Sequence, residues 1–126
     1  MNRATSLTCL ALLAALSANA HAFENGTELF EAMSKGTALR QNGAMMFIAG
    51  TVDGIQEGFA FGHQTATGKK MTMGAAGRMM GYCLPRGVTN GQLSDAVKQY
   101  LTANPAERQR GATAVIFGSM VKAFPC

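Results

Sequence analysis

The C-terminal third of the chain contains two consecutive segments whose apolar residues recur at the spacing of an α-helix. At the start of the first segment, Thr89 and Gln92 form a capping box, in which two side chains satisfy backbone groups that a helix start leaves free. We therefore predict a helix from residue 89 that exposes Asp95, Lys98 and Gln99. The residues predicted to be buried follow the pattern i, i+3, i+4, i+7, i+8 and are Leu93, Ala96, Val97, Tyr100 and Leu101.

The second segment begins at Asn104 and Pro105. Asparagine is a favourable N-cap, proline suits the first helical position, and Glu107 would complete the cap. We expect one helix from here until Pro125 interrupts it. Its predicted buried side consists of Ala112, Val115, Ile116, Ser119, Met120 and Ala123.

Two more helical segments precede these, at residues 27–35 and 43–61. The first opens with acidic residues, which the helix dipole favours there, and stops at Gly36. In the second, Asp53 and Glu57 fall opposite the apolar stripe, and we interpret them as a solvated face. That stripe consists of Ala44, Ile48, Val52, Ile55 and Phe59, with Phe47 beside it. Strand patterns are absent, so the predicted fold is an all-α, four-helix domain.

Glycine recurs every four residues along the second of these helices, at Gly50, Gly54, Gly58 and Gly62. Each glycine inside a helix costs about 1 kcal/mol relative to alanine. We interpret the repeat as a surface on which another helix packs closely, within the chain or across a dimer. The alternative is a weak helix that ends near Gly58.

Residues 62–82 are rich in glycine, threonine, lysine and methionine, and they predict a long irregular connection with a short helical turn at 75–80. Long loops in small domains are often functional, and flexible methionines adapt to partner surfaces. The alternative is a tolerated insertion without a role. The candidate partner-binding residues are Lys69, Lys70, Met71, Met73 and Arg78.

The N-terminus has the three parts of a secretory signal peptide. Arg3 is the only charged residue before Glu24, an apolar run covers 7–16, and Ala20 and Ala22 form an A-x-A cleavage site. The run is too short to span a bilayer core of about 30 Å. We predict cleavage after Ala22 and export across the inner membrane to the periplasm.

Removing 22 of the 126 residues leaves 104, which suffices for one domain at 23–126. The net charge falls from +4 to +3 because Arg3 leaves, and this is too small to indicate nucleic-acid binding. Two cysteines remain, Cys83 and Cys126, and an oxidising compartment favours a disulfide between them. A reactive thiol or a metal ligand is the alternative, but neither cysteine has a C-x-x-C neighbour or a nearby histidine.

Three motifs of the C-terminal half resemble those of a known family. Residues 83–93 read C-x-P-x-G-V-T-x-x-Q-L, 100–105 read Y-L-x-x-x-P, and 123–126 read A-F-P-C. These motifs resemble those of the Tai/Rap family of immunity proteins, which is linked to type VI secretion and protects bacteria against injected peptidoglycan amidases. Upstream, F-I-A-G at 47–50 resembles the family's Y-I-x-G helix, and 28–32 resembles its first helix. The resemblance implies a four-helix fold, a homodimer, a protein partner and no catalysis. Many members have cysteine where this chain has Met33 and Ala44, so a second disulfide is missing.

The expected function is therefore a periplasmic immunity protein that binds a peptidoglycan amidase and blocks its substrate cleft. The first alternative is a periplasmic chaperone, although seven acidic residues are few for the acid-stress type. The second is copper binding by soft methionine ligands together with His63. We predict no cofactor, no metal and no catalysis, because no base accompanies a nucleophile. The methionines of the copper hypothesis are Met71, Met73, Met79 and Met80.

Overall fold

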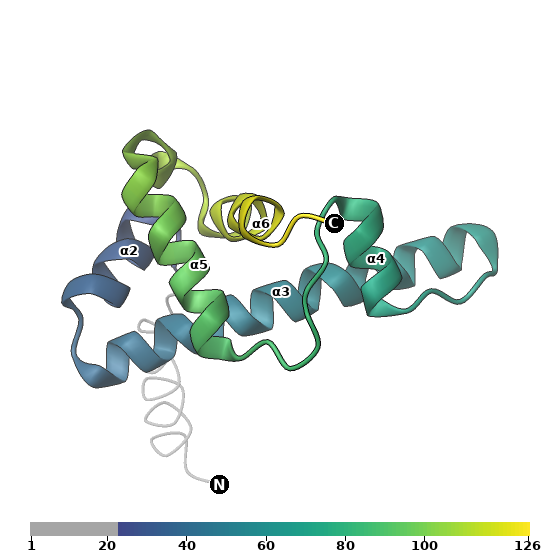
Figure 1. The fold of residues 1–126 in the computed structure, drawn as a ribbon, viewed down its shortest axis with the longest axis horizontal. Helices are drawn as coiled ribbons and strands as arrows, with labels where there is room; N and C mark the ends of the chain where they lie inside the picture. The colour runs from purple at the N-terminus through teal and green to yellow at the C-terminus, as the bar shows by residue number, and fades with distance from the viewer. Residues whose placement is uncertain (1–22) are drawn as a thin grey trace, which may run out of the picture.

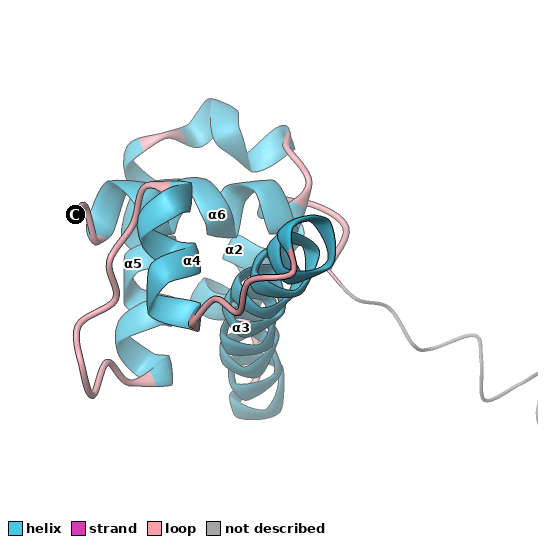
Figure 2. Ribbon diagram, turned by 90° about the vertical axis from the view of Figure 1, so that its right-hand side faces the viewer, coloured by secondary structure: helices cyan, strands magenta, loops and turns pink. Residues whose placement is uncertain are grey.

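The computed structural model describes residues 23–126, and in this range the fold is all-α with one disulfide, as predicted (Figure 1). The signal peptide predicted at residues 1–22 lies outside the described residues. Figure 2, viewed from the side of α4, shows helices joined by loops. The helices are α2 (Gly26–Lys35), α3 (Ala38–Thr67), α4 (Met73–Met80), α5 (Asn90–Ala103), the 3-10 helix η1 (Pro105–Gln109) and α6 (Ala112–Ala123).

A single core lies between α2, α5, α6 and the first half of α3. We call these elements the body. Long apolar side chains from all four helices are removed from solvent here, and burying each one stabilises the fold by roughly 1.5–3 kcal/mol. The fully buried side chains include Leu29, Ile48, Val52, Val97, Leu101, Val115, Ile116 and Met120.

The start of α5 confirms the predicted capping box. The backbone N–H of Gln92 donates to the Thr89 hydroxyl at 3.2 Å, and the N–H of Thr89 donates to the Gln92 side chain at 2.8 Å. The predicted stripe is also confirmed, with Tyr100 half-buried and its other members buried. Local sequence therefore determines both the start and the direction of this helix.

The prediction of one helix from Asn104 is wrong. The Asn104 side chain donates to the carbonyl oxygen of Tyr100 at the end of α5, at 2.9 Å, and does not cap η1. Backbone pairing with the segment before α2 interrupts the helix, because Gly26 N–H donates to Arg110 O and Ala112 N–H donates to Glu24 O. The buried side of α6 is as predicted except at its last position, residue 123, which is exposed.

Helix α3 is longer than predicted at both ends. It begins after Thr37, whose hydroxyl accepts from the N–H of Arg40, and it ends at Gly68, which has the left-handed φ of 71°. The helix does not end near Gly58. A Cβ built at each glycine of the four-residue repeat would meet nothing within 4 Å, so no described helix packs on them. The prediction of close packing within the chain is wrong, and packing across a dimer stays a prediction.

The segment 62–82 is mostly helical, which corrects the prediction of an irregular connection. Residues 62–67 continue α3, and the predicted turn at 75–80 is part of α4, which Thr72 caps through a hydrogen bond to Ala75 N–H at 3.2 Å. Only residues 68–72 form a loop. We call residues 58–80 the arm, because they extend beyond the body as a helical hairpin (Figure 1).

Candidate protein-interaction site

Small buried residues hold the two helices of the arm together. Ala76 and Gly77 of α4 are buried against α3, where Gln56 and Ala60 are also buried. A Cβ at Gly77 would lie 2.9 Å from the side-chain Nε2 of Gln56 on α3 and 2.9 Å from the carbonyl oxygen of Tyr82, in the turn after α4. Real Cβ atoms do not come this close to backbone, so glycine at position 77 permits both this turn and the close contact with α3. The arm is therefore a braced hairpin.

The base of the arm is fastened to the end of α6. Cys83 N–H donates to Phe124 O at 2.8 Å, and the predicted Cys83–Cys126 disulfide is present with its Cα atoms 4.9 Å apart. Between α4 and this disulfide, the Tyr82 ring packs edge-on against Phe117. Burial raises the pKa of Tyr82, although hydrogen bonding to Gln56 acts in the opposite direction. The phenol therefore stays protonated at neutral pH.

The five predicted partner-binding residues all lie on the arm. Lys69 and Lys70 are exposed in its loop, and Arg78 is exposed on α4. Met71 and Met73 are half-buried at the start of α4. The only ion pair of residues 23–126 is Arg110–Glu107, which lies in the body, so the three cations of the arm are unpaired within the described chain.

Three large apolar side chains on the arm are exposed but do not belong to the five predicted partner-binding residues. Phe61 is 72% exposed, Met79 is 62% exposed, and Phe59, which the predicted stripe placed in the core, is 37% exposed. Steps of 100° per residue place Phe61 on the same side of α3 as Gly54, away from the buried stripe. That calculation was the available signal for Phe61. Phe59 lies beyond the reach of the body, and only the fold reveals its exposure.

The geometry gives little support to the copper hypothesis. Within the described residues, no three side chains of histidine, cysteine, aspartate or glutamate gather closely enough to hold a metal ion. The half-buried Met71, Met73 and Met80 are partly occupied in packing, and Met79 is exposed. No helix within 23–126 is both long and apolar enough to cross a membrane.

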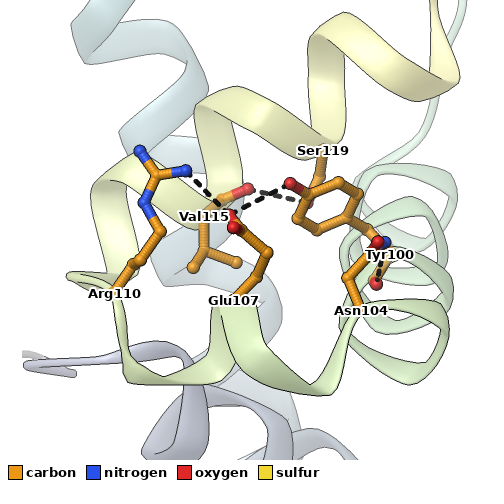
Figure 3. A network of polar contacts seen from close by, with 6 residues as sticks. All are labelled: Tyr100, Asn104, Glu107, Arg110, Val115 and Ser119. Carbon is orange, nitrogen blue, oxygen red and sulfur yellow. Dashed lines mark hydrogen bonds and ion pairs between the residues drawn. The ribbon is translucent and has the colours of Figure 1, made fainter.

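A polar cluster lies at η1, the short helix that connects α5 to α6 (Figure 3). The Tyr100 hydroxyl donates to Glu107 Oε2 at 3.2 Å, and Arg110 Nη1 lies 2.7 Å from the same oxygen. The guanidinium of Arg110 is the main cause that lowers the pKa of Glu107. Burial, and then the hydrogen bond to Glu107, raise the pKa of Tyr100. The cluster therefore ties η1 to α5.

A disulfide-linked helical body that projects a braced arm with exposed apolar and cationic side chains defines a class, the small protein-binding domain. The arm offers a surface for another protein.

Within that class the chain belongs to the Rap1a immunity protein family, whose model matches residues 8–126. This match confirms the resemblance seen in the sequence motifs. Members of the family are immunity proteins, which act by binding a protein effector and are generally not enzymes. No curated protein and no solved structure matches the chain.

Proposed function

We propose that this chain is a periplasmic immunity protein that binds and inhibits a peptidoglycan amidase delivered by type VI secretion. Membership of the immunity family supports the protein partner. The secretory pattern of residues 1–22 supports export, with cleavage after Ala22 leaving 23–126 as the acting domain. A peptidoglycan amidase acts in the periplasm, so its inhibitor must be exported as well.

The exposed apolar surface of the arm is the observation that carries this proposal. Burying an exposed phenylalanine such as Phe61 against a partner gains the same hydrophobic free energy as burying it in a core. Aromatic residues and methionine are enriched at protein interfaces, and methionine adapts to irregular surfaces. The arm presents both, through Phe61 and Met79.

The cations of the arm indicate the charge of the partner surface. Lys69, Lys70 and Arg78 lie on the same arm as the exposed apolar residues and have no acidic partner within the described chain. An acidic rim around the partner's substrate cleft would attract the arm and accelerate association. A braced hairpin is also narrow enough to enter a substrate cleft, so binding alone would block catalysis, without any cofactor or metal.

The experiment is affinity capture followed by measurement of binding and inhibition. Immobilised oxidised protein would be exposed to extracts of the source organism and its competitors, and the captured hydrolase would be titrated by calorimetry. A Phe61→Ala variant should weaken binding by roughly 30-fold or more, as expected for an interface hot spot. The matched control is Leu39→Ala, which alters an 84% exposed residue at the opposite end of α3.

Capture of one stoichiometric hydrolase, inhibited when bound and released by the arm variant only, would support the proposal. Equal loss in both variants, or no hydrolase at all, would reject it. Capture of many partly unfolded proteins would instead favour the chaperone alternative, which the same exposed apolar residues could serve.

A homodimer is also part of the proposal. The outer side of α3 is uncovered at Gly50 and Gly54, so a second copy could approach its backbone closely. Light scattering during size-exclusion chromatography would give the mass, and a monomer at micromolar concentration would reject this part alone.

A further inference from the structure

Two hollows open on either side of Tyr100, between α5 and α6, and both lie outside the arm. The larger has a volume of about 450 Å³ and the smaller about 240 Å³. Tyr100 and Lys122 line both hollows, so the two form one interrupted groove, which we call the Tyr100 groove. Phe117 and Val121 provide apolar wall on one side, and Gln99 and Asn104 provide polar wall on the other.

The position of Tyr100 within the groove is fixed by two contacts. Its hydroxyl donates to Glu107, as Figure 3 shows. Its ring lies against α6, since a Cβ at Gly118 would meet the tyrosine oxygen at 3.4 Å, an ordinary van der Waals distance. The groove is therefore a formed feature of the surface whose central side chain is held in place.

The unpaired charge in the groove is positive and comes from Lys122, which makes no ion pair within the described chain. Arg110 also lines the larger hollow, but Glu107 pairs with it. The acidic group nearby is Glu107, whose carboxylate already accepts from Arg110 and Tyr100. An exposed ammonium beside apolar wall is complementary to a ligand segment that combines a carboxylate with aliphatic side chains.

The groove continues from the base of the arm. Val121, which lines the larger hollow, faces the turn that ends α4, since a Cβ at Gly81 would lie 4.0 Å from Val121 Cγ1. In Figure 1 the end of α4 also lies beside the C-terminal end of α6. A partner seated on the arm could therefore extend a segment along α6 without leaving the surface.

We propose that the Tyr100 groove binds an apolar, carboxylate-bearing segment of the protein that the arm binds, as a second contact that adds specificity. This inference rests on the proposed function for the identity of the partner. The chemistry of the groove itself can be tested without that partner, because the groove requires only a peptide of the right character.

The test uses full-chain protein labelled with ¹⁵N and two blocked pentapeptides that differ in one residue. The first has leucine, glutamate and leucine between glycines, and the second has glutamine in place of glutamate. We expect the glutamate peptide to shift the amide signals of Gly118 and Val121. We expect its affinity to exceed that of the glutamine peptide by about threefold to fivefold, the range for an exposed ion pair. Lys122→Gln should remove this preference, whereas Lys98→Gln, which alters an exposed lysine outside the groove, should preserve it.

Equal binding of both peptides, shifts confined to the arm, or an equal effect of the two lysine variants would overturn the inference. With a captured hydrolase in hand, Lys122→Glu should weaken binding while Lys98→Glu does not. A hydrolase that tolerates Lys122→Glu but not Phe61→Ala would reject the groove and keep the proposed function. Peptide selectivity without any captured hydrolase would support the groove and reject the proposed function.

Discussion

The body and the arm use apolar residues in opposite ways. In the body, long side chains such as Ile48 and Leu101 are completely buried. In the arm, the buried positions are small, such as Ala60, Ala76 and Gly77, while the large apolar side chains are half-buried or exposed. The buried residues are therefore large in the body, where they stabilise the fold, and small in the arm, where large apolar residues stay accessible.

This difference in the size of the buried residues shows how a small chain can expose large apolar side chains and still fold. Small residues let α3 and α4 approach closely, so the arm keeps its shape with little buried area. The free energy that a phenylalanine would contribute to a core stays available for a partner. Stability and binding should then depend on different residues, and four experiments test this separation.

The largest expected effect separates Leu101→Ala from Phe61→Ala. Leu101 is fully buried, so its truncation leaves a cavity and should lower the free energy of unfolding by about 2–5 kcal/mol. Phe61 is 72% exposed, and its truncation should change stability by less than about 0.5 kcal/mol. Urea denaturation of both variants measures the difference. A comparable loss in the two would mean that the arm is part of the core after all.

The disulfide tests the junction between the two regions. Loop-entropy arithmetic for its sequence separation of 43 residues gives at most about 4 kcal/mol, and measured values are often smaller. The double variant Cys83→Ser with Cys126→Ser should melt at lower temperature, and reduced wild-type protein should match it. Amide exchange should accelerate more in α4 than in α5, because the bond fastens the base of the arm. An unchanged melting temperature would show that the crosslink contributes nothing.

Gly77→Ala probes packing inside the arm. The added Cβ would lie 2.9 Å from the carbonyl oxygen of Tyr82 and 2.9 Å from Gln56 Nε2, so the turn after α4 and its contact with α3 should both shift, at a cost of about 1–3 kcal/mol. Gly74→Ala is the control on the same helix, because a Cβ there meets nothing within 4 Å and alanine favours a helix. Circular dichroism melting of the pair measures both. If Gly77→Ala is as stable as Gly74→Ala, the arm is looser than its geometry indicates.

The smallest effect concerns Glu107 in the body. Because Arg110 lowers the pKa of Glu107 in the folded protein, the ionised carboxylate stabilises the fold at pH values above its ordinary pKa of 4.5. This contribution is lost as the pH falls through the lowered pKa. Glu107→Gln should therefore reduce the melting temperature slightly at pH 6, and the difference from wild type should shrink under acid conditions. A difference that grows as the pH falls would contradict the assignment.

Local chemistry explains which parts of the fold could be predicted. The start of α5 was found to the residue, since the Thr89 and Gln92 cap involves groups only three positions apart. Asn104 was misread because it serves the end of α5, while pairing of residues 110–112 with 24–26 decides where α6 begins. That pairing joins segments far apart in sequence, so no local pattern reports it.

The candidate site also contains residues whose exposure the local sequence predicts and others whose exposure depends on the tertiary arrangement. The cations at Lys69 and Lys70 were found from composition, because charged loop residues are exposed in almost any fold. The exposure of Phe59 depends on how far α3 extends past α5 and α6, and the groove at Tyr100 depends on the packing of α5 against α6. Tertiary arrangement decides both, so the sequence alone could not reveal them.

The left-handed conformation of Gly68 ends α3 before the loop begins, and it separates the loop residues from the helix in their tolerance of substitution. Residues 69 and 70 are exposed and no buried core residue comes from them, whereas Gly68 needs its positive φ. Substitutions at Lys69 or Lys70 should alter the shape and charge of the arm with little effect on folding. Under the proposed function, these two positions can therefore change with the partner independently of the core.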